Sequence, residues 1–295
     1  MQARHRLTFR SDHGGDPAAW RAFADLLHDT FGIDITILDA LGGPDPTLAP
    51  FGWFDAAGTC VASLCAFSIP LVIGGTFVRG AGLQSGAVRP QWRRQGLFRD
   101  LIGAALNHCA AEGFEAVTLL TDTPALYTPF GFRPLPLYRF EGPPPSRGAT
   151  AGARPLDLRN DADITLLRRL LDARRPVADR FAPLRQVEMF LFNAALSPDI
   201  RLAFMEDSTA AIAWRTGDGG LFDLVDIAGP TIPPLADILA ALDLSPTRIV
   251  TRFSPDHLDW QGKAVAESDR LTLMMRGAEA LIPPHPFGLS PLAEF

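Results

Sequence analysis

The sequence predicts a mixed α/β (α+β) protein of two domains, each with a mixed, mostly antiparallel sheet flanked by helices. Two observations support this prediction. The chain has 295 residues, which is long for one domain and comfortable for two. The order strand, two helices, three strands, helix, strand is expected once before a proline-rich stretch near residue 145 and once after it.

Two helices of the first half are clearly marked. Asp16 and Pro17 begin the first with an N-cap and a first-turn proline, and apolar residues at helical spacing continue to Phe31. The second covers 97–111 and ends at Gly113. Glycine-containing turns between the apolar runs indicate an antiparallel meander. The strands expected here are 6–10, 51–55, 60–69, 76–88, 116–120 and 132–140, with short helices at 33–41 and 124–127.

A linker is expected after the first half. Residues 142–148 read Gly-Pro-Pro-Pro-Ser-Arg-Gly, a composition that stays extended and cannot form a core. We therefore expect one domain at 1–141 and a second at 152–295, with a proline-rich C-terminal tail extended across the surface. The second half is expected to contain strands at 156–158, 200–205, 210–215, 221–227, 248–253 and 270–275 and helices at 161–173, 185–196 and 234–242.

Composition narrows the function classes. A net charge of −6 and a pI near 5.5 argue against nucleic acid as the main partner and are compatible with a cationic substrate. Cys60, Cys65 and Cys109 are odd in number and lack metal-ligand spacing, so buried free thiols in a reducing cytoplasm are expected, without a metal. No secretory signal is expected at 1–10, and no apolar run is long enough to span a membrane.

The stretch 88–98, Val-Arg-Pro-Gln-Trp-Arg-Arg-Gln-Gly-Leu-Phe, joins an expected strand to an expected helix. Backbone N–H groups at a helix start lack intrahelical partners and attract phosphate. Gly96 permits close approach of the backbone, and Arg93 and Arg94 add positive charge. Taken alone, the pattern fits an ordinary strand-to-helix connection with solvated arginines equally well, because it is neither a dinucleotide fingerprint nor a P-loop.

Two motifs together resemble a known family. The spacing Val88-x-Pro90-x-x-Arg93-Arg94-x-Gly96-Leu97 resembles the acetyl-CoA motif of the GNAT acyltransferase superfamily. The segment 127–132, Tyr-Thr-Pro-Phe-Gly-Phe, resembles the motif that follows the fifth strand of that superfamily. The subfamily most similar is the Eis-type acetyltransferases, in which a catalytic GNAT domain continues into a degenerate GNAT-like domain. The specific similarity covers about 62–132 and is architectural elsewhere.

The resemblance implies a site for acetyl-CoA as co-substrate. The backbone of Gly86 and Val88 would hold the pantetheine arm, and an N–H there would polarise the thioester carbonyl. Tyr127 would protonate the leaving thiolate, although a purely structural tyrosine is the alternative. Phe98 departs from the small residue frequent in the superfamily and from the leucine common in Eis-type proteins. The full set implied to bind acetyl-CoA is Gly86, Ala87, Val88, Arg93, Arg94, Gln95, Gly96, Leu97 and Phe98.

The acceptor is expected to be an amine on a small molecule or peptide, attacking the thioester directly without a covalent enzyme intermediate. The general base is open among His28, Asp25, Asp29, Asp122 and the carboxylate of Phe295. Asp122 also fits as a helix cap. Two other classes fit the sequence: a non-catalytic acyl-CoA-binding or sensing protein, and an interaction protein with a vestigial site.

The stretch 88–98, with its arginine pair and helix start, is called the cradle below. The second half lacks an equivalent stretch. Its counterpart, residues 226–234, reads Asp-Ile-Ala-Gly-Pro-Thr-Ile-Pro-Pro, without an arginine pair and with prolines that remove N–H donors. We therefore expect this half to bind no CoA and instead to close the acceptor cleft or form a subunit interface, which would make the chain a homo-oligomer. Arg174 and Arg175 are expected on a solvated helix face.

Overall fold

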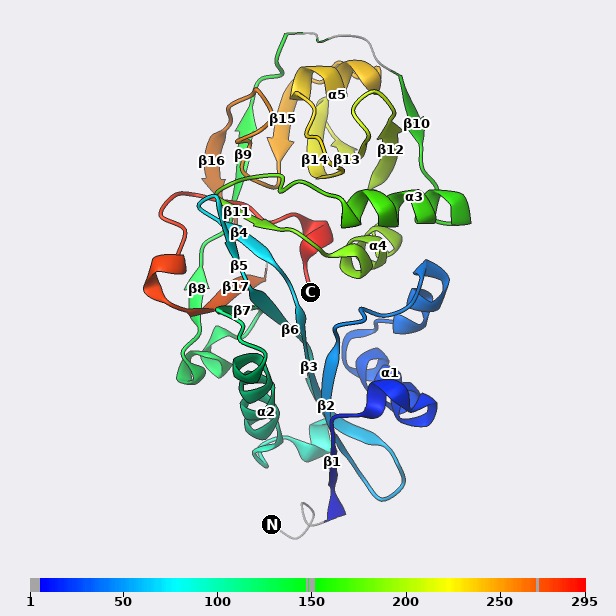
Figure 1. Ribbon diagram of the computed structural model, residues 1–295, viewed down its shortest axis with the longest axis vertical. Coiled ribbons are helices and arrows are strands. Elements are labelled where there is room, and N and C mark those ends of the chain that lie inside the picture. The colour runs from blue at the N-terminus through cyan, green and yellow to red at the C-terminus, as the bar shows by residue number, and fades with distance from the viewer. Residues whose placement is uncertain (1–5, 147, 149–151, 269–270) are drawn as a thin grey trace. The chain divides into compact units, whose positions relative to one another are not determined.

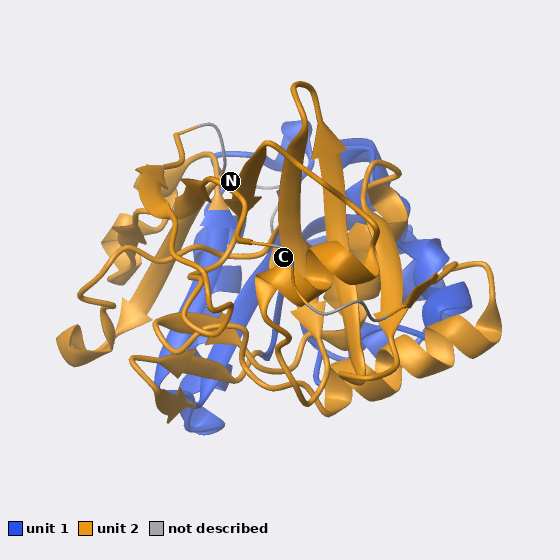
Figure 2. Ribbon diagram, turned by 90° about the horizontal axis from the view of Figure 1, so that it is seen from above, with its two compact units in different colours: residues 1–68, 79–120, 295 blue, residues 69–78, 121–294 orange. Residues whose placement is uncertain are grey.

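The computed structural model describes residues 6–146, 148, 152–268 and 271–295. Two compact units are present: unit 1 contains Met1–Ser68, Arg79–Leu120 and Phe295, and unit 2 contains Ile69–Val78 and Thr121–Glu294 (Figure 2). The domains 1–141 and 152–295 stay a prediction, and residues 147 and 149–151 of the expected linker lie outside the described residues.

Unit 1 contains five neighbouring strands in the order β1-β2-β3-β6-β7 (Figure 1). Neighbours are antiparallel except β6 and β7, which are parallel and joined by helix α2. The antiparallel meander expected from the sequence is confirmed for β2, β3 and β6. The strands are β1 (Thr8–Arg10), β2 (Ala49–Phe54), β3 (Cys60–Ser68), β6 (Gly80–Val88) and β7 (Ala116–Thr121).

Helices α1 (Pro17–Phe31) and α2 (Leu97–Ala111) cover opposite faces of these strands (Figure 1). Both were expected from the sequence. The Asp16 carboxylate caps α1 by accepting hydrogen bonds from the amides of Ala18 and Ala19, as its residue type predicts. The segment expected as a short helix at 33–41 forms a 3₁₀ helix at Ile35–Leu41.

Unit 2 repeats this topology. Its sheet has the order β10-β12-β13-β14-β15-β9-β16, and its one parallel pair among the described strands, β14 and β15, is joined by helix α5 (Leu235–Ala241). The repeat of architecture expected from the sequence is therefore confirmed. The other helices are α3 (Asp161–Asp172) and α4 (Val187–Leu196). The strands are β9 (Tyr138–Gly142), β10 (Ala153–Pro155), β12 (Arg201–Met205), β13 (Ala210–Gly217), β14 (Leu221–Ala228), β15 (Arg248–Thr251) and β16 (Lys263–Ala266).

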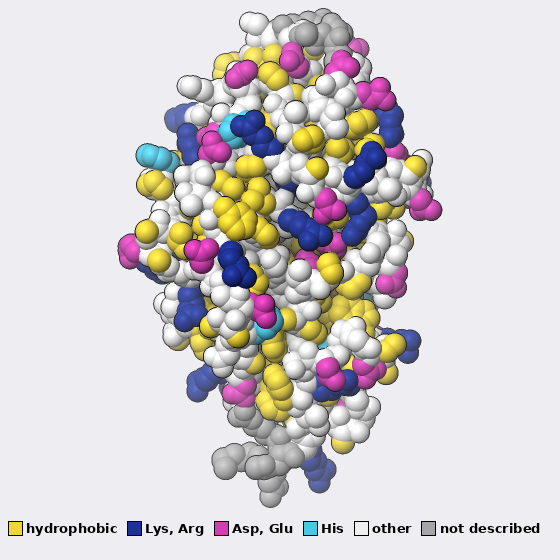
Figure 3. Space-filling view, in the orientation of Figure 1, with side chains coloured by type: hydrophobic (Ala, Val, Ile, Leu, Met, Phe, Trp, Pro, Cys, Tyr) yellow, Lys and Arg dark blue, Asp and Glu magenta, His cyan; other side chains and the backbone are white. Residues whose placement is uncertain are grey.

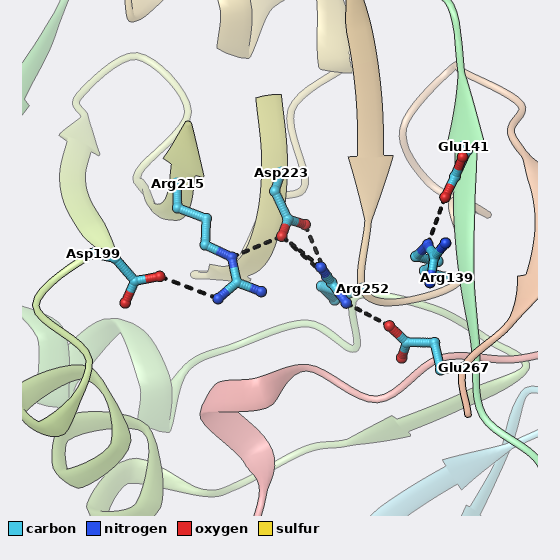
Figure 4. A network of polar contacts seen from close by, with 7 residues as sticks. All are labelled: Arg139, Glu141, Asp199, Arg215, Asp223, Arg252 and Glu267. Carbon is cyan, nitrogen blue, oxygen red and sulfur yellow. Dashed lines mark hydrogen bonds and ion pairs between the residues drawn. The ribbon is translucent and has the colours of Figure 1, made fainter. Parts of the chain in front are cut away.

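Ion pairs hold the strand ends of unit 2 together (Figure 4). The buried carboxylate of Asp223, on β14, accepts hydrogen bonds from Arg215 Nε and Arg252 Nη2, both at 2.8 Å. Arg252 also pairs with Glu267, which follows β16, and Arg215 pairs with Asp199 at 3.2 Å. Because one buried carboxylate serves two guanidinium groups, the network ties β13, β14 and the chain beyond β15 to one point.

Three strand predictions were wrong. The segment 132–140 is not one strand: β8 (Arg133–Leu135) pairs with β17 (Thr272–Gly277), whereas β9 joins the other sheet. The segment 76–88 breaks at Arg79 into β5 (Thr76–Val78) and β6, and β5 forms a small sheet with β4 (Leu71–Ile73) and β11 (Phe181–Pro183). The strand expected at 156–158 is replaced by β10, directly before it; Arg270, expected to begin the last strand, lies outside the described residues.

The C-terminal tail is not extended across the surface as expected. Its residues from Phe287 to Ser290 are buried, as are Leu292 and Ala293. The Tyr138 amide donates to the Phe287 carbonyl at 2.9 Å, and Gly288 lies so close to backbone that a Cβ there would be 2.4 Å from the Arg252 carbonyl oxygen. The tail from Phe287 to Ala293 is therefore packed within unit 2, whereas residues 284–286 are exposed.

On the face drawn in Figure 3, acidic and basic side chains are interspersed rather than segregated. None of the helices in the described part of the chain has both the length and the apolarity needed to cross a bilayer.

Candidate functional site

The central feature of unit 1 is the point where β6 and β7 part. Their paired residues run from Gly80 opposite Ala116 to Leu83 opposite Leu119. Strand β6 continues for five more residues to Val88, held by β3 on its other side. The described β6–β7 ladder thus ends halfway along β6, which gives the backbone of residues 84–88 an edge that a ligand can pair with.

A β-bulge lies at this parting. Ser63 opposes Ala87 and Cys65 opposes Gln84, so one residue of β3 faces two of β6, Ser85 and Gly86. Ser85 has a φ of 60°, a left-handed conformation that is unusual for a residue with a side chain. An inserted residue reverses the alternation of side-chain faces along a strand, and the bulge therefore redirects the backbone beyond it.

The two faces of β6 show this reversal directly. A Cβ on Gly82 would meet the rings of Phe67 and Phe295, whereas a Cβ on Gly86 would meet Phe98, on α2, at 3.2 Å and the Leu64 side chain at 3.4 Å. Residues four apart in a regular strand share a face. Gly82 and Gly86 face opposite sides because the bulge lies between them.

The segment 89–96 connects β6 to α2 through a compact turn. Residues Pro90–Trp92 make a 3₁₀ turn, Arg93 Nε donates to the Val88 carbonyl at 3.1 Å, and Gln95 Nε2 donates to the Gln91 carbonyl at 3.3 Å. Arg94 and Gly96 have φ values of 60° and 83°. These two left-handed residues turn the chain sharply into the start of α2.

The start of α2 is suited to an anion. Its N-cap is Gly96, which has no side chain to satisfy the first amides of the helix, and the side chains of Arg93 and Arg94 are exposed. Helix-start amides carry the positive end of the helix dipole. The local structure therefore combines backbone donors with two exposed cations. Phe98 is half-buried against Gly86, so its ring forms the floor beside the open part of β6.

Tyr127 lies in unit 2 between two single 3₁₀ turns, Pro124–Leu126 and Thr128–Phe130. Its side chain is buried, and its ring contacts Phe132 edge-on with centroids 6.0 Å apart. Burial, and to a lesser extent the charge of Asp122, raises the pKa of Tyr127 to about 12. The hydroxyl is therefore protonated at neutral pH and chemically able to donate a proton.

Residues 18–135 match the family model described as the acetyltransferase (GNAT) domain. Residues 18–135 form a GNAT acetyltransferase domain. The match includes both the cradle and the Tyr127 segment, so the two motifs of the sequence belong to one domain pattern. No curated protein matches the chain.

Solved structures share the fold over nearly the whole chain. A probable N-acyltransferase of unknown function from Enterococcus faecalis V583 has 12% identity and a TM-score of 0.62 over 92% of this chain and 73% of its own. A GCN5-related N-acetyltransferase from Anabaena variabilis has 15% identity and a TM-score of 0.60, covering 92% and 72%. Eis1 from Mycobacterium abscessus has 17% identity and a TM-score of 0.58, also covering 92% and 72%. At these identities the likeness establishes the fold.

The five candidate bases differ in their surroundings. Asp29, on α1 of the GNAT domain, is held by Arg89 through an ion pair of 2.6 Å, and Arg89 also donates to the Cys60 carbonyl. Asp25 and His28 lie exposed on the same helix. Sequence reasoning missed Arg89, whose place directly after the strand was the available signal.

The other two candidates are Asp122 and Phe295. Asp122 accepts a hydrogen bond from Thr123 Oγ1 at 2.8 Å, and the N-cap of the following turn is Thr123, so the expected cap role of Asp122 is wrong. The ring of Phe295 meets Phe67 edge-on with centroids 5.2 Å apart, next to Gly82. The ring of the last residue of the chain thus packs on the sheet of unit 1 beside Gly82, which precedes the bulge and the open part of β6.

The three cysteines are free and buried, as expected. Burial raises the pKa of Cys60 to about 12 and raises that of Cys65 further, so neither thiol is reactive at neutral pH. Among the described residues, no group of three or more His, Cys, Asp and Glu side chains is placed to hold a metal ion.

Unit 2 has a similar bulged strand, but a side chain occupies the edge that follows the bulge. Its strand β14 also carries an irregularity, since Ala213 opposes Asp226 while Trp214 opposes Leu224, and its pairing with β15 also ends at Leu224. Beyond that point, Arg174 Nη2 donates to Asp226 Oδ1 at 2.6 Å and to the Ile227 carbonyl at 2.9 Å.

The prediction that Arg174 lies on a solvated helix face is therefore wrong. The Arg174 side chain is 2% exposed and that of Asp226 is 1% exposed. The guanidinium occupies the backbone edge that corresponds to the open part of β6 in the GNAT domain. The neighbouring Arg175 is exposed, as expected.

Proposed function

We propose that this protein is an acetyl-CoA-dependent N-acetyltransferase that transfers an acetyl group to a primary amine by direct attack. The observation that carries the proposal is the parting of β6 from β7, followed at once by a helix start with two exposed arginines. A ligand with an amide-containing arm and a pyrophosphate matches both parts, and acyl-CoA has both. The GNAT domain match supports this reading.

In this proposal the backbone of Gly86, Ala87 and Val88 pairs with the pantetheine arm as an added strand. The amides at 95–98 and the side chains of Arg93 and Arg94 bind the pyrophosphate. The ring of Phe98 supports the arm where it passes Gly86. The same set of residues was expected from the family motif.

The chemistry needs two proton transfers and one oxyanion. A neutral amine attacks the thioester carbonyl, and a backbone N–H of the redirected part of β6 stabilises the oxyanion. Collapse of the tetrahedral intermediate breaks the C–S bond, and Tyr127, which is protonated at neutral pH, donates its proton to the leaving thiolate. The amine proton passes to a general base; Asp25, His28, Asp122 and the Phe295 carboxylate are the candidates, because Asp29 is engaged by Arg89.

We assign catalysis to the domain 1–141 and a supporting role to the domain 152–295. The Arg174–Asp226 pair supports this assignment, because it fills the place where a second ligand arm would pair. The three buried free thiols are compatible with a reducing cytoplasm.

The test is acetyl-CoA-dependent thiol release over a panel of amines: aminoglycosides, polyamines, amino acids and lysine peptides. We expect release with at least one class, and a loss of at least tenfold in kcat/KM in the Arg93→Ala/Arg94→Ala variant. Arg21→Ala, which removes an exposed arginine from α1, is the matched control and keeps parental turnover. Tight acetyl-CoA binding with no release would indicate a sensing protein, and neither binding nor release would indicate an interaction protein; both outcomes contradict the proposal.

A further inference from the structure

The β-bulge of β6 contains a residue in an unfavourable backbone conformation, so neighbouring groups must stabilise it. Ser85 is held with a φ of 60°, which a residue with a side chain adopts only when its surroundings impose it. The β6–β7 ladder ends two residues earlier, at Leu83, so β7 does not impose it. The constraint must come from β3, the strand that remains paired.

A buried side chain of β3 binds Ser85. Ser63 Oγ donates to the Ser85 carbonyl at 2.7 Å, and Ser63 is fully buried. The inserted residue is therefore held through its carbonyl by Ser63.

The Ser63 contact has the larger consequence for the backbone. A peptide group is rigid, so fixing the Ser85 carbonyl also fixes the N–H of Gly86 in the same plane. That peptide is where β6 changes the direction of its faces, as the opposite environments of Gly82 and Gly86 show. Without the Ser63 hydroxyl, the Ser85 carbonyl would lose a buried donor, and a regular pairing without the bulge would become competitive.

We propose that Ser63 is a positioning residue of the acyl-transfer site: its hydroxyl locks the β6 bulge and so aims the backbone donors of residues 86–88 at the thioester. This inference rests on the proposed function. Ser63 touches neither substrate nor cofactor and acts through Ser85. It therefore affects alignment in the transition state more than the grip on the pyrophosphate, which belongs to the cradle.

The experiment compares Ser63→Ala with Thr118→Val. Thr118 is buried, and its Oγ1 donates to the Ala81 carbonyl at 3.2 Å, so Thr118→Val also removes a hydroxyl that binds a β6 carbonyl, but in the regular part of the strand. We expect Ser63→Ala to lower kcat about tenfold to a hundredfold with less than about a twofold change in the KM for acetyl-CoA, because small misplacements of reacting groups are costly. Thr118→Val keeps parental kcat, and Ser63→Thr, which retains the hydroxyl, recovers most of the rate.

Ser63→Cys supplies a weaker donor of nearly the same shape, gives an intermediate kcat and covers a failure of Ser63→Ala to fold. The inference is overturned if Ser63→Ala retains kcat within about twofold, if Thr118→Val loses as much, or if the loss lies in KM. Amide hydrogen exchange decides independently of turnover: Ser63→Ala should speed exchange at 84–88 and Thr118→Val should not. Absence of turnover in the parent contradicts the proposed function. Unchanged amide hydrogen exchange at 84–88 in Ser63→Ala contradicts the positioning role of Ser63.

Discussion

Arg174 and Asp226 form an almost fully buried ion pair of 2.6 Å at the end of β14. The same guanidinium binds the Ile227 carbonyl, and the Ile227 amide donates to Asp226 Oδ1 at 2.8 Å. The backbone N–H and the carbonyl of Ile227 are thus both hydrogen-bonded to the ion pair. In the GNAT domain the equivalent edge of β6 is the proposed binding place of pantetheine. The proposal therefore gives the open edge of β6 a ligand, whereas the matching edge of β14 is filled by Arg174.

Replacement of Arg174 by methionine is expected to destabilise the protein strongly. The variant leaves the Asp226 carboxylate buried without its cation, which costs about 3–5 kcal/mol of unfolding free energy. Urea denaturation measures the loss. Arg175→Met, at the exposed neighbouring position, should change stability by less than about 0.5 kcal/mol. Equal effects of the two substitutions would show that the buried pair has no special role.

Tyr127→Phe is expected to lower kcat about a hundredfold while leaving acetyl-CoA affinity unchanged, because it removes the proton donor and keeps the ring. Tyr138→Phe, at the other tyrosine of the chain, is the control and should retain parental kcat. Steady-state kinetics with the best amine measure both. A Tyr127→Phe enzyme as fast as the parent would assign the hydroxyl a structural role.

The same hydroxyl predicts a stability change at alkaline pH. The pKa of Tyr127 is about 12 in the folded chain, against 10 for an ordinary tyrosine, so the folded state retains the proton longer than the unfolded state. Its contribution to stability is full below about pH 10 and is lost as pH rises toward 12. Denaturation between pH 9 and 12 should show a shallower decline in Tyr127→Phe than in the parent; parallel curves would argue against the shift.

His13 predicts a stability change at acid pH. It is fully buried, with its ring 5.6 Å from that of Phe23 and 5.3 Å from that of Phe54, and burial, together with the charge of Arg10, lowers its pKa to about 4. The unfolded state then binds a proton more readily between pH 6.5 and 4. The associated stability, up to about 3 kcal/mol, is full above pH 6.5 and is lost as pH falls toward 4.

His13→Leu should therefore flatten the acid side of the stability profile, as followed by urea denaturation from pH 7 to 4. His285→Leu, at an exposed position, should leave that slope unchanged. An unchanged slope in His13→Leu would mean that another group controls the acid response.

Local signals predicted the parts of the fold that local chemistry determines. The Asp16 cap, the α2 periodicity and the repeated order of elements were legible because each depends on residues close in sequence. The turn into α2 was predicted for the same reason, since its arginines and Gly96 are adjacent in the sequence.

The missed features depend on partners far along the chain. The segment 132–140 divides between two sheets because β17 and β15, more than 100 residues later, compete for it. Ser63 donates a hydrogen bond to Ser85, 22 positions away, and Arg174 binds Asp226, 52 positions away. In each case composition alone shows an ordinary strand serine or helix-end arginine, and only the tertiary pairing gives it a role.

Calorimetric titration with acetyl-CoA measures whether the chain has the proposed site. We expect one binding site per chain in the parent, because the edge of β14 is filled by Arg174 and the edge of β6 is open. We expect affinity at least tenfold weaker in Arg93→Ala/Arg94→Ala and unchanged affinity in Arg21→Ala. Absence of binding in the parent, or equal affinity in the cradle variant and the parent, would contradict the proposed site.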